Sequence, residues 1–303
     1  MSIEIRVLRS AALVMVFTVI FSDRPVFAQD TPGVLVSAAW LSEHLDDPSL
    51  VILNVGMPTA RSENGFIPGT RFLDYQEIAR MRNGLITEIP QIDELIDTFE
   101  RAGVSNDALV IVYGSPSHLP ARVYMTLDYL GHGERTAVLD GGLESWRAEG
   151  RPVARSPRAP TRATFLPSIQ DDVLVTSEWI ADQLDGYTTI IDARPENEYT
   201  GERVPRTGRP GHIPGAYNLY WEDLIVSSEN PVLRDLSEIR ARFDESGADQ
   251  MGTVVSYCYI GMRASYTYLI SKYLGYDARF YDGSWNEWGQ NESLPAVTGS
   301  SRR

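Results

Sequence analysis

Cysteine and histidine are scarce in this sequence of 303 residues. Cys258 is the only cysteine, so an intrachain disulfide, a dithiol redox pair and a cysteine-rich zinc site are excluded. The four histidines are far apart and lack the spacing of metal ligands: His44, His118, His132 and His212. We therefore expect neither a metal ion nor a cofactor.

Positively charged residues are also few in comparison with negatively charged ones. Lys and Arg number 27 against 41 Asp and Glu, which gives a formal net charge of -14. A protein that binds nucleic acid needs clustered positive charge, so we expect no nucleic-acid partner. With 43% hydrophobic and 10% aromatic residues the composition is that of a globular protein. At about 150 residues per domain, the length predicts two domains.

The first 28 residues have the three parts of a signal peptide. Arg6 and Arg9 precede an apolar run at 11–21, and Val26-Phe27-Ala28 offers a cleavage site. The run is too short for a membrane-spanning helix, which needs about 20 residues. We expect residues 1–28 to be removed, leaving a periplasmic or secreted protein with no membrane contact. The alternative is an uncleaved helix.

The remainder of the chain is a duplication. Four landmarks recur in order at offsets of 139 to 146 residues: 35–41 with 174–180, 65–69 with 211–215, 110–114 with 254–258, and 140–146 with 282–288. So long a period means two copies of a whole domain. We place the first domain at 31–153 and the second at 171–298. The proline-containing stretch 154–170 between them predicts a surface linker.

Each copy alternates short apolar runs with helical patterns. In the second, 188–192 and 253–257 predict buried strands, and 177–184, 235–245 and 264–274 predict helices. The last has an apolar stripe of Tyr266, Leu269, Ile270, Tyr273 and Leu274. This alternation predicts an α/β fold in which each parallel sheet is flanked by helices on both faces. Ligands of such sheets bind at the carboxyl ends of the strands, where Cys258 stands.

Cys258 follows a predicted strand and precedes a predicted helix. A thiol there faces the positive end of the helix dipole, and Arg263 adds a permanent cation. Gly261 permits a backbone twist that can turn N–H groups inward to hold an anion. These features favour a reactive thiolate. The alternative is an inert buried cysteine.

Three motifs give the chain a resemblance to the tandem-domain rhodaneses, a family of sulfurtransferases. They are Asp192-Ala-Arg194 with Glu198-Tyr199, the string Gly-His-Ile-Pro-Gly-Ala at 211–216, and the loop 258–263 followed by 282–288. The resemblance covers about residues 33–297. It implies two tandem rhodanese-like domains, of which the second is catalytic.

The first copy lacks the residues that would make it active. Gly114 stands opposite Cys258, and Asn54 and Gly56 replace the positions of Asp192 and Arg194. The resemblance implies that this copy is non-catalytic and that it walls the cleft and docks the second domain.

The resemblance implies a two-step transfer in which Cys258 takes a sulfur atom as a persulfide and passes it to an acceptor such as cyanide or a thiol. Cys258 and Arg263 would be catalytic. The donor would be bound by Arg194, Tyr259, Ile260, Gly261 and Met262. For Arg194, a structural ion pair with Asp192 or Glu198 is the alternative.

Three further residues have motif positions but no predicted catalytic role. We expect His212 to hold the turn before Pro214, and Trp285 and Trp288 to lie in the core or cleft wall.

The sequence leaves alternatives open for the sulfur donor and for the class of reaction. Arg194 and Arg263 suit the doubly charged thiosulfate, but 3-mercaptopyruvate stays open. A cysteine-loop phosphatase or arsenate reductase is less favoured, because only four residues separate Cys258 from Arg263 where a phosphate cradle has five. The alternative that is not an enzyme is a persulfide carrier or a redox sensor. We expect small-molecule donors and acceptors, a thiol protein as a further acceptor, and a monomer.

Overall fold

The computed structural model describes residues 32–57, 65–204, 208–249 and 251–302. The predicted signal peptide, 1–28, lies outside the described residues. Thr31–Arg303 is one compact unit of the chain, and it contains both repeats.

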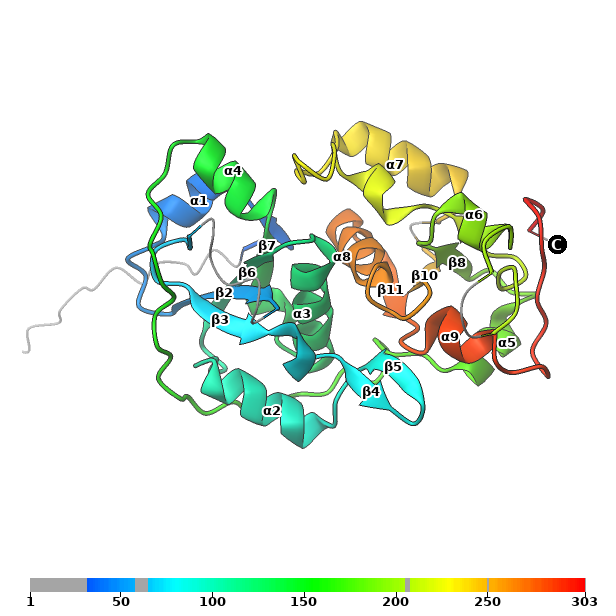
Figure 1. Cartoon of the computed structure of the whole chain (residues 1–303), viewed down its shortest axis with the longest axis horizontal. Helices are drawn as coiled ribbons and strands as arrows, with labels where there is room; N and C mark the ends of the chain where they lie inside the picture. Colours follow the sequence, from blue (N-terminus) through cyan, green and yellow to red (C-terminus); the bar gives the residue numbers. More distant parts are fainter. Residues whose placement is uncertain (1–31, 58–64, 205–207, 250, 303) are drawn as a thin grey trace, which may run out of the picture. The chain divides into compact units, whose positions relative to one another are not determined.

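The first repeat is built on five parallel strands in the order β1-β7-β6-β2-β3 (Figure 1). Their bounds are β1 Leu35–Val36, β2 Leu50–Gly56, β3 Arg71–Asp74, β6 Leu109–Gly114 and β7 Thr136–Leu139. Helices lie in three of the connections between these strands: α1 Ala38–Glu43 between β1 and β2, α2 Ile92–Arg101 between β3 and β6, and α3 His118–Tyr129 between β6 and β7. Helix α4, Gly142–Ala148, follows β7.

Side chains of the central strands alternate between two cores. Val51, Leu53 and Val55 of β2 pack in the core that contains α2 and α3. Ile52, between them, packs in the core that contains α1 and α4. Because successive strand residues point to opposite faces, a strand with both faces covered is apolar throughout.

The second repeat has a four-stranded parallel sheet in the order β11-β10-β8-β9. The strands are β8 Thr189–Asp192, β9 Tyr217–Asn218, β10 Thr253–Tyr257 and β11 Asp277–Phe280. The helices are α5 Ser177–Gln183, α6 Glu196–Tyr199, α7 Leu236–Glu245, α8 Ala264–Leu274 and α9 Ser284–Trp288. A bridge from Leu174 to Phe280 stands where β1 meets β7 in the first repeat.

Helices cover both faces of this sheet as well. One core joins β8 and β10 to α7 and α8, and the other joins them to α5 and α9. The predicted α/β fold, with a parallel sheet flanked by helices on both faces in each repeat, is confirmed. The predicted strand 253–257 and helix 264–274 have the observed bounds, and the other predicted elements differ by one residue at one end.

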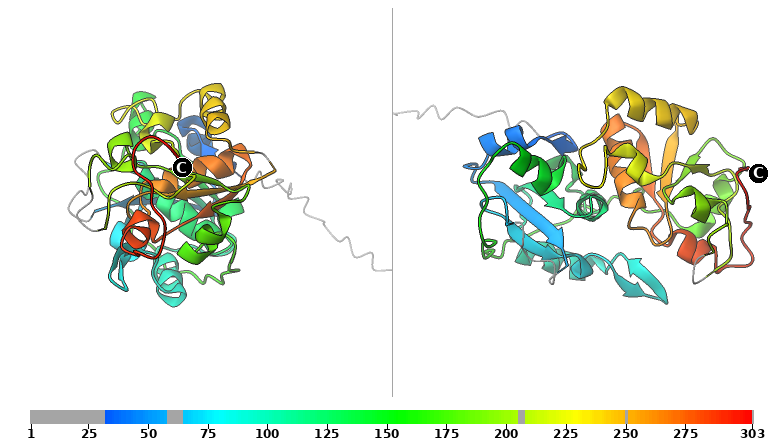
Figure 2. Two further views of the ribbon diagram at one scale, coloured as in Figure 1. Left: turned by 90° about the vertical axis from the view of Figure 1, so that its right-hand side faces the viewer. Right: turned by 45° about the horizontal axis from the view of Figure 1, so that its top comes forward.

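Two segments lie outside these sheets. A hairpin of β4, Arg80–Arg82, and β5, Leu85–Glu88, stands away from the five-stranded sheet (Figure 2). The stretch predicted as a linker runs along the first repeat, where Phe165 is buried against Phe99 and Arg162 pairs with Glu100.

Helix α8 is buried on more than one side. The predicted stripe is correct for Tyr266, Leu269, Ile270 and Leu274, which are buried, but Tyr273 is exposed. The helix packs on its own sheet and also on α3 of the first repeat (Figure 1). Small polar residues of α8 are therefore enclosed. Ser271, for example, donates to the Thr267 carbonyl oxygen within the helix.

No helix among the described residues is both long enough and apolar enough to span a membrane.

Burial of α8 predicts a large difference between two alanine substitutions. Leu269→Ala removes a fully buried side chain and should lower the free energy of unfolding by about 2–5 kcal/mol. Tyr273→Ala, on the exposed side of the same helix, should lower it by about 1 kcal/mol or less. Urea denaturation of both variants measures this, and equal losses would contradict the observed packing.

Candidate active site

The Cys258 loop, residues 258–263, connects β10 to α8 at the carboxyl edge of the second sheet. Cys258 itself is fully buried. Its N–H donates to the Ser284 hydroxyl oxygen at 3.2 Å, and its carbonyl oxygen accepts from the Trp285 N–H at 2.9 Å. The first turn of α9 therefore holds the base of the loop.

The loop turns at Gly261, whose φ is 79°. A Cβ at this position would lie 2.8 Å from the carbonyl oxygen of Asp282. Both the left-handed backbone and the close contact require glycine. The backbone twist predicted from the sequence is therefore present.

Arg263 ends the loop and is held by Glu198 of α6. The two side chains form a double hydrogen bond, Nη2 to Oε2 at 2.7 Å and Nη1 to Oε1 at 3.3 Å. Burial lowers the pKa of Arg263, but the negative charges of a Cys258 thiolate and of Glu198 outweigh it, so the pKa is raised. Arg263 therefore stays charged at the end of the loop that begins with Cys258.

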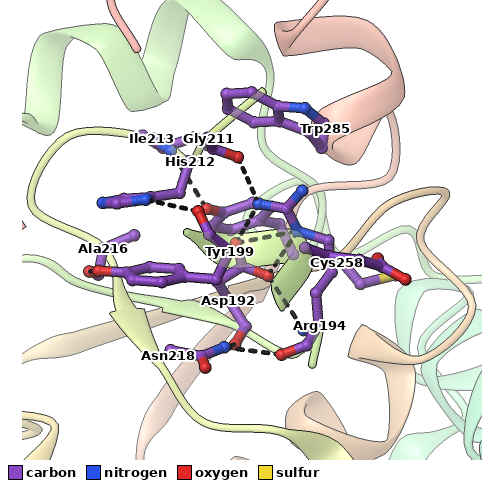
Figure 3. Close-up of polar contacts among 12 residues, drawn as sticks. Asp192, Arg194, Tyr199, Gly211, His212, Ile213, Ala216, Asn218, Cys258 and Trp285 are labelled. Carbon is purple, nitrogen blue, oxygen red and sulfur yellow. Dashed lines mark hydrogen bonds and ion pairs between the residues drawn. The ribbon is translucent and has the colours of Figure 1, made fainter. Parts of the chain in front are cut away.

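Arg194 is fully buried and paired with Asp192 at the end of β8 (Figure 3). Its Nε and Nη2 donate to the carboxylate at 2.9 and 2.6 Å, and Nη2 also donates to the Gly211 carbonyl oxygen at 2.8 Å. The guanidinium lies 4.9 Å from the ring centroid of Trp285. Burial lowers the pKa of Arg194, but the negative charge of Asp192 raises it by more. The pKa therefore lies above its usual value, and the guanidinium stays charged.

The structure therefore has the ion pair between Arg194 and Asp192 that the sequence offered as an alternative. One nitrogen, Nη1, is buried and has no protein partner among the described residues. Binding of a donor anion by Arg194 stays a prediction, and Nη1 is the nitrogen that could donate a hydrogen bond to that anion.

His212 and the two tryptophans have structural contacts. His212 is buried, stacks on Tyr199 at 3.6 Å, and places Nδ1 2.9 Å from the Tyr199 carbonyl oxygen (Figure 3). The indole N–H groups of Trp285 and Trp288 donate to the carbonyl oxygens of Arg209 and Pro295. Trp285 and Trp288 are fully buried in the core, as expected, whereas the side chain of His212 contacts Tyr199 and its role at the turn before Pro214 stays a prediction.

The middle of the Cys258 loop contacts the first repeat. Ile260 and Met262 pack against the core that contains α2 and α3, whereas Tyr259 packs in its own repeat beside α9. The Thr87 hydroxyl of the β4–β5 hairpin donates to the Ile260 carbonyl oxygen at 2.5 Å. The loop residues predicted to bind the donor are thus divided between the two repeats.

Sequence reasoning missed two residues that the first repeat contributes. His118, at the start of α3, lies edge-on to Trp221 at 5.1 Å, and burial and then the charge of Arg263 lower its pKa to about 4. Arg122, one turn further, is fully buried and pairs with Asp282 at 2.6 Å. Both follow Gly114 on α3, so aligning the two repeats through their loops would have drawn attention to them.

The equivalent site of the first repeat is closed. Gly114 lies beside Val55 on the neighbouring strand, and a Cβ there would lie 2.2 Å from the Val55 carbonyl oxygen. No cysteine fits at this position without a shift of the strand.

The Cys258 loop combines a buried thiol, a helix start and a cation at its far end, which suits a thiolate nucleophile and an anionic sulfur bound to it. No group of three or more His, Cys, Asp or Glu side chains suited to a metal ion occurs in the described part of the chain.

Comparison with known proteins agrees with this arrangement. The model of the rhodanese-like domain matches residues 37–149 and 176–291. A protein named sulfur carrier protein TtuD, from Thermus thermophilus, is 32% identical over 88% of this chain and 98% of its own. The thiosulfate sulfurtransferase of Azotobacter vinelandii is 32% identical over 86% of this chain and 96% of its own.

Among solved structures, Escherichia coli SseA, described as a 3-mercaptopyruvate sulfotransferase with a rhodanese fold, matches with a TM-score of 0.71 and 25% identity. The match covers 84% of this chain and 99% of SseA. The two matched segments of the family model fall inside the predicted domain ranges 31–153 and 171–298. With both repeats matched, this chain belongs to the rhodanese family and carries two rhodanese-like domains in tandem.

Proposed function

We propose that this rhodanese-type sulfurtransferase takes its sulfur from thiosulfate, holds it as a persulfide on Cys258, and passes it to cyanide or a thiol. One observation carries the proposal. The only thiol of the chain lies at the end of β10, on a loop that turns at Gly261 and closes with Arg263 at the start of α8.

The transfer has two balanced steps. The Cys258 thiolate attacks the outer sulfur of thiosulfate, the sulfur–sulfur bond of the donor breaks, and its electron pair leaves with sulfite. Cyanide then attacks the outer sulfur of the persulfide, and the electron pair of the broken bond returns to Cys258 as thiocyanate leaves. No oxidant or reductant is needed, and the two half-reactions predict ping-pong kinetics.

Charge supports thiosulfate as the donor. Arg263 stands at the end of the loop and Arg194 has Nη1 without a protein partner, so two cations can face a dianion. The Azotobacter relative bears the name of this activity. Glu198 offsets part of the charge of Arg263, which leaves room for the monoanionic 3-mercaptopyruvate, the substrate in the description of SseA.

A persulfide carrier is the second candidate. The Thermus relative is named a sulfur carrier protein, and it matches over almost its whole length. In that case the acceptor is a thiol protein and the chain delivers one sulfur for each loading. Because Cys258 is fully buried, the side chains that cover it must move before either kind of acceptor reaches the sulfur.

The proposal includes the state of the mature protein. The sequence features of residues 1–28 support export to the periplasm or beyond, with cleavage after Ala28. The two repeats already bury a face of α3 against α8 within one chain, which supports a monomer.

The first prediction concerns the persulfide. Incubation of the mature protein with thiosulfate should add one sulfur atom to the intact mass, and Cys258→Ser, which removes the nucleophile and keeps its size, should add none. Intact-mass spectrometry of both proteins measures this. Sulfur loaded on the serine variant would overturn the mechanism, and loading by 3-mercaptopyruvate alone would overturn the choice of donor.

Turnover separates the two candidates. An enzyme should form thiocyanate continuously from thiosulfate and cyanide, whereas a carrier should release at most one equivalent before it is reloaded by a partner. If all sulfur donors fail and a phosphate ester is hydrolysed instead, the phosphatase class replaces both.

The second prediction concerns Arg263. Loss of its charge in Arg263→Ala should move the pH midpoint of Cys258 alkylation upward by about one unit, since a nearby cation favours the thiolate. Arg203→Ala is the control, because Arg203 also faces Glu198, at 3.5 Å, but is exposed. Alkylation by iodoacetamide across a pH series measures both. An unchanged midpoint in Arg263→Ala would remove Arg263 from the thiolate argument.

The third prediction concerns export. Expressed with its first 28 residues in a Gram-negative host, the protein should appear in the periplasm and begin at Gln29. Ala28→Lys should block cleavage and yield a heavier product, because signal peptidase needs a small residue there. Cell fractionation with terminal sequencing tests this, and a full-length cytoplasmic product would contradict it.

A further inference from the structure

A buried ion pair between the two repeats stands directly behind the Cys258 loop. Arg122 of α3 donates from Nη1 to Oδ1 of Asp282 at 2.6 Å, and its side chain is fully buried. The two residues are 160 positions apart in sequence. The first repeat thus places a cation inside the second.

This ion pair touches the turn of the loop. A Cβ added to Gly261 would lie 3.0 Å from Oδ1 of Asp282 and 3.3 Å from Nη1 of Arg122. The loop backbone therefore rests on the ion pair with no side chain between them. Any change in the position or charge of the ion pair acts on the loop at van der Waals distance.

The same arginine holds the hairpin that clamps the loop. Nη2 of Arg122 donates to the Thr87 carbonyl oxygen at 3.0 Å, and the Thr87 hydroxyl in turn donates to Ile260 of the loop. Thr87 has a φ of 62°, a costly conformation for a β-branched residue. The Ile89 N–H donates to the other oxygen of Asp282 at 2.7 Å. Arg122 and Asp282 together therefore fix the hairpin against the loop.

We propose that Arg122 is a positioning residue for the Cys258 loop, supplied by the repeat that lacks a nucleophile. It holds Asp282 and Thr87 in place, and it neutralises the carboxylate that would otherwise stand uncompensated beside the turn at Gly261. Without that cation, a thiolate or persulfide in the loop would face a negative charge.

The charges around the ion pair support this assignment. Burial, and next the charge of Asp282, raise the pKa of Glu88 to about 8, while Arg122 lowers it. Glu287 and Arg82 also act on Glu88. On the other side of the loop, Arg263 pairs with Glu198 at 2.7 Å. Below pH 8 Glu88 is mostly protonated, so Asp282 is the carboxylate behind Gly261 whose charge Arg122 offsets.

The other repeat provides a matched control. Asp140 occupies the position in the first repeat that Asp282 occupies in the second, and its Oδ1 accepts from the Leu233 N–H at 2.8 Å. Leu233 is in turn the counterpart of Ile89, at the offset of 144 residues that relates Gly114 to Cys258. At this offset Tyr266 stands in place of Arg122. The contact near Asp140 is thus of the same kind but has neither the cation nor the nucleophile.

Three variants test the proposal by the sign of their effect. Arg122→Gln leaves Asp282 unpaired and should raise the pH midpoint of Cys258 alkylation by about one unit. Asp282→Asn leaves Arg122 unpaired and should lower that midpoint. Asp140→Asn removes the equivalent negative charge from the first repeat, keeps an oxygen that can accept from the Leu233 N–H, and should leave the midpoint unchanged. Alkylation across a pH series and thermal unfolding are measured for each variant.

A merely structural role would lower the melting temperature of the variants without shifts of opposite sign. The neutral double variant Arg122→Gln/Asp282→Asn should return the midpoint toward that of the wild type, because both charges are gone. If Arg122→Gln does not fold, the alkylation midpoint of Asp282→Asn compared with that of Asp140→Asn still tests the proposal. Equal midpoints in those two variants, or shifts of the same sign in Arg122→Gln and Asp282→Asn, would overturn the proposal.

A role of Arg122 in catalysis rests on the proposed function, and the rate of sulfur loading tests the two together. Arg122→Gln should load sulfur from thiosulfate about tenfold more slowly than the wild type. If the wild type loads no sulfur, the proposed function fails, while the alkylation midpoints still test Arg122. If the wild type loads and Arg122→Gln loads equally fast, only the positioning role fails.

Discussion

The packing of α3 against α8 is the contact on which the rest of this molecule depends. Each helix follows the central strand of its own repeat, and each begins just after the loop that starts with Cys258 in the second repeat and with Gly114 in the first. Because α8 is buried between its sheet and α3, the start of α8 is held by both repeats. The Cys258 loop ends at that start, so its geometry depends on the whole duplicated chain.

Electrostatics at the site follow from this packing. A protein with a net charge of -14 must place its cations close to a thiolate if it is to stabilise one. Arg263 ends the Cys258 loop and Arg122 lies against its turn at Gly261. These two arginines pair with Glu198 and Asp282, and Arg194 pairs with Asp192. Each pair is buried or half-buried, where removal of one partner leaves a charge uncompensated. The site therefore depends on pairs, and a single substitution acts through the partner that remains.

Local sequence was enough to predict much of the secondary structure around Cys258. The bounds of β10 and α8 follow from a short apolar run, a glycine-containing loop and a helical stripe, all of which are features of neighbouring residues. Tyr273 was assigned to the buried stripe because its spacing is helical, but the side of α8 that it occupies is open. The enclosure of Arg122 could not be predicted, because its partner lies 160 residues away and in the other repeat. Periodicity within one element carries no information on such a contact.

The duplication lets the repeat without a thiol contribute to the surroundings of the Cys258 loop. In the first repeat, Gly114 packs against Val55 so closely that no side chain fits, and the site cannot regain a cysteine without a shift of the strand. The helix that follows Gly114 nevertheless presents Arg122 and His118 to the other repeat. The repeat without the thiol therefore contacts the other repeat through α3. A substitution on this side of α3 can act on the Cys258 loop, although only the second repeat carries the thiol.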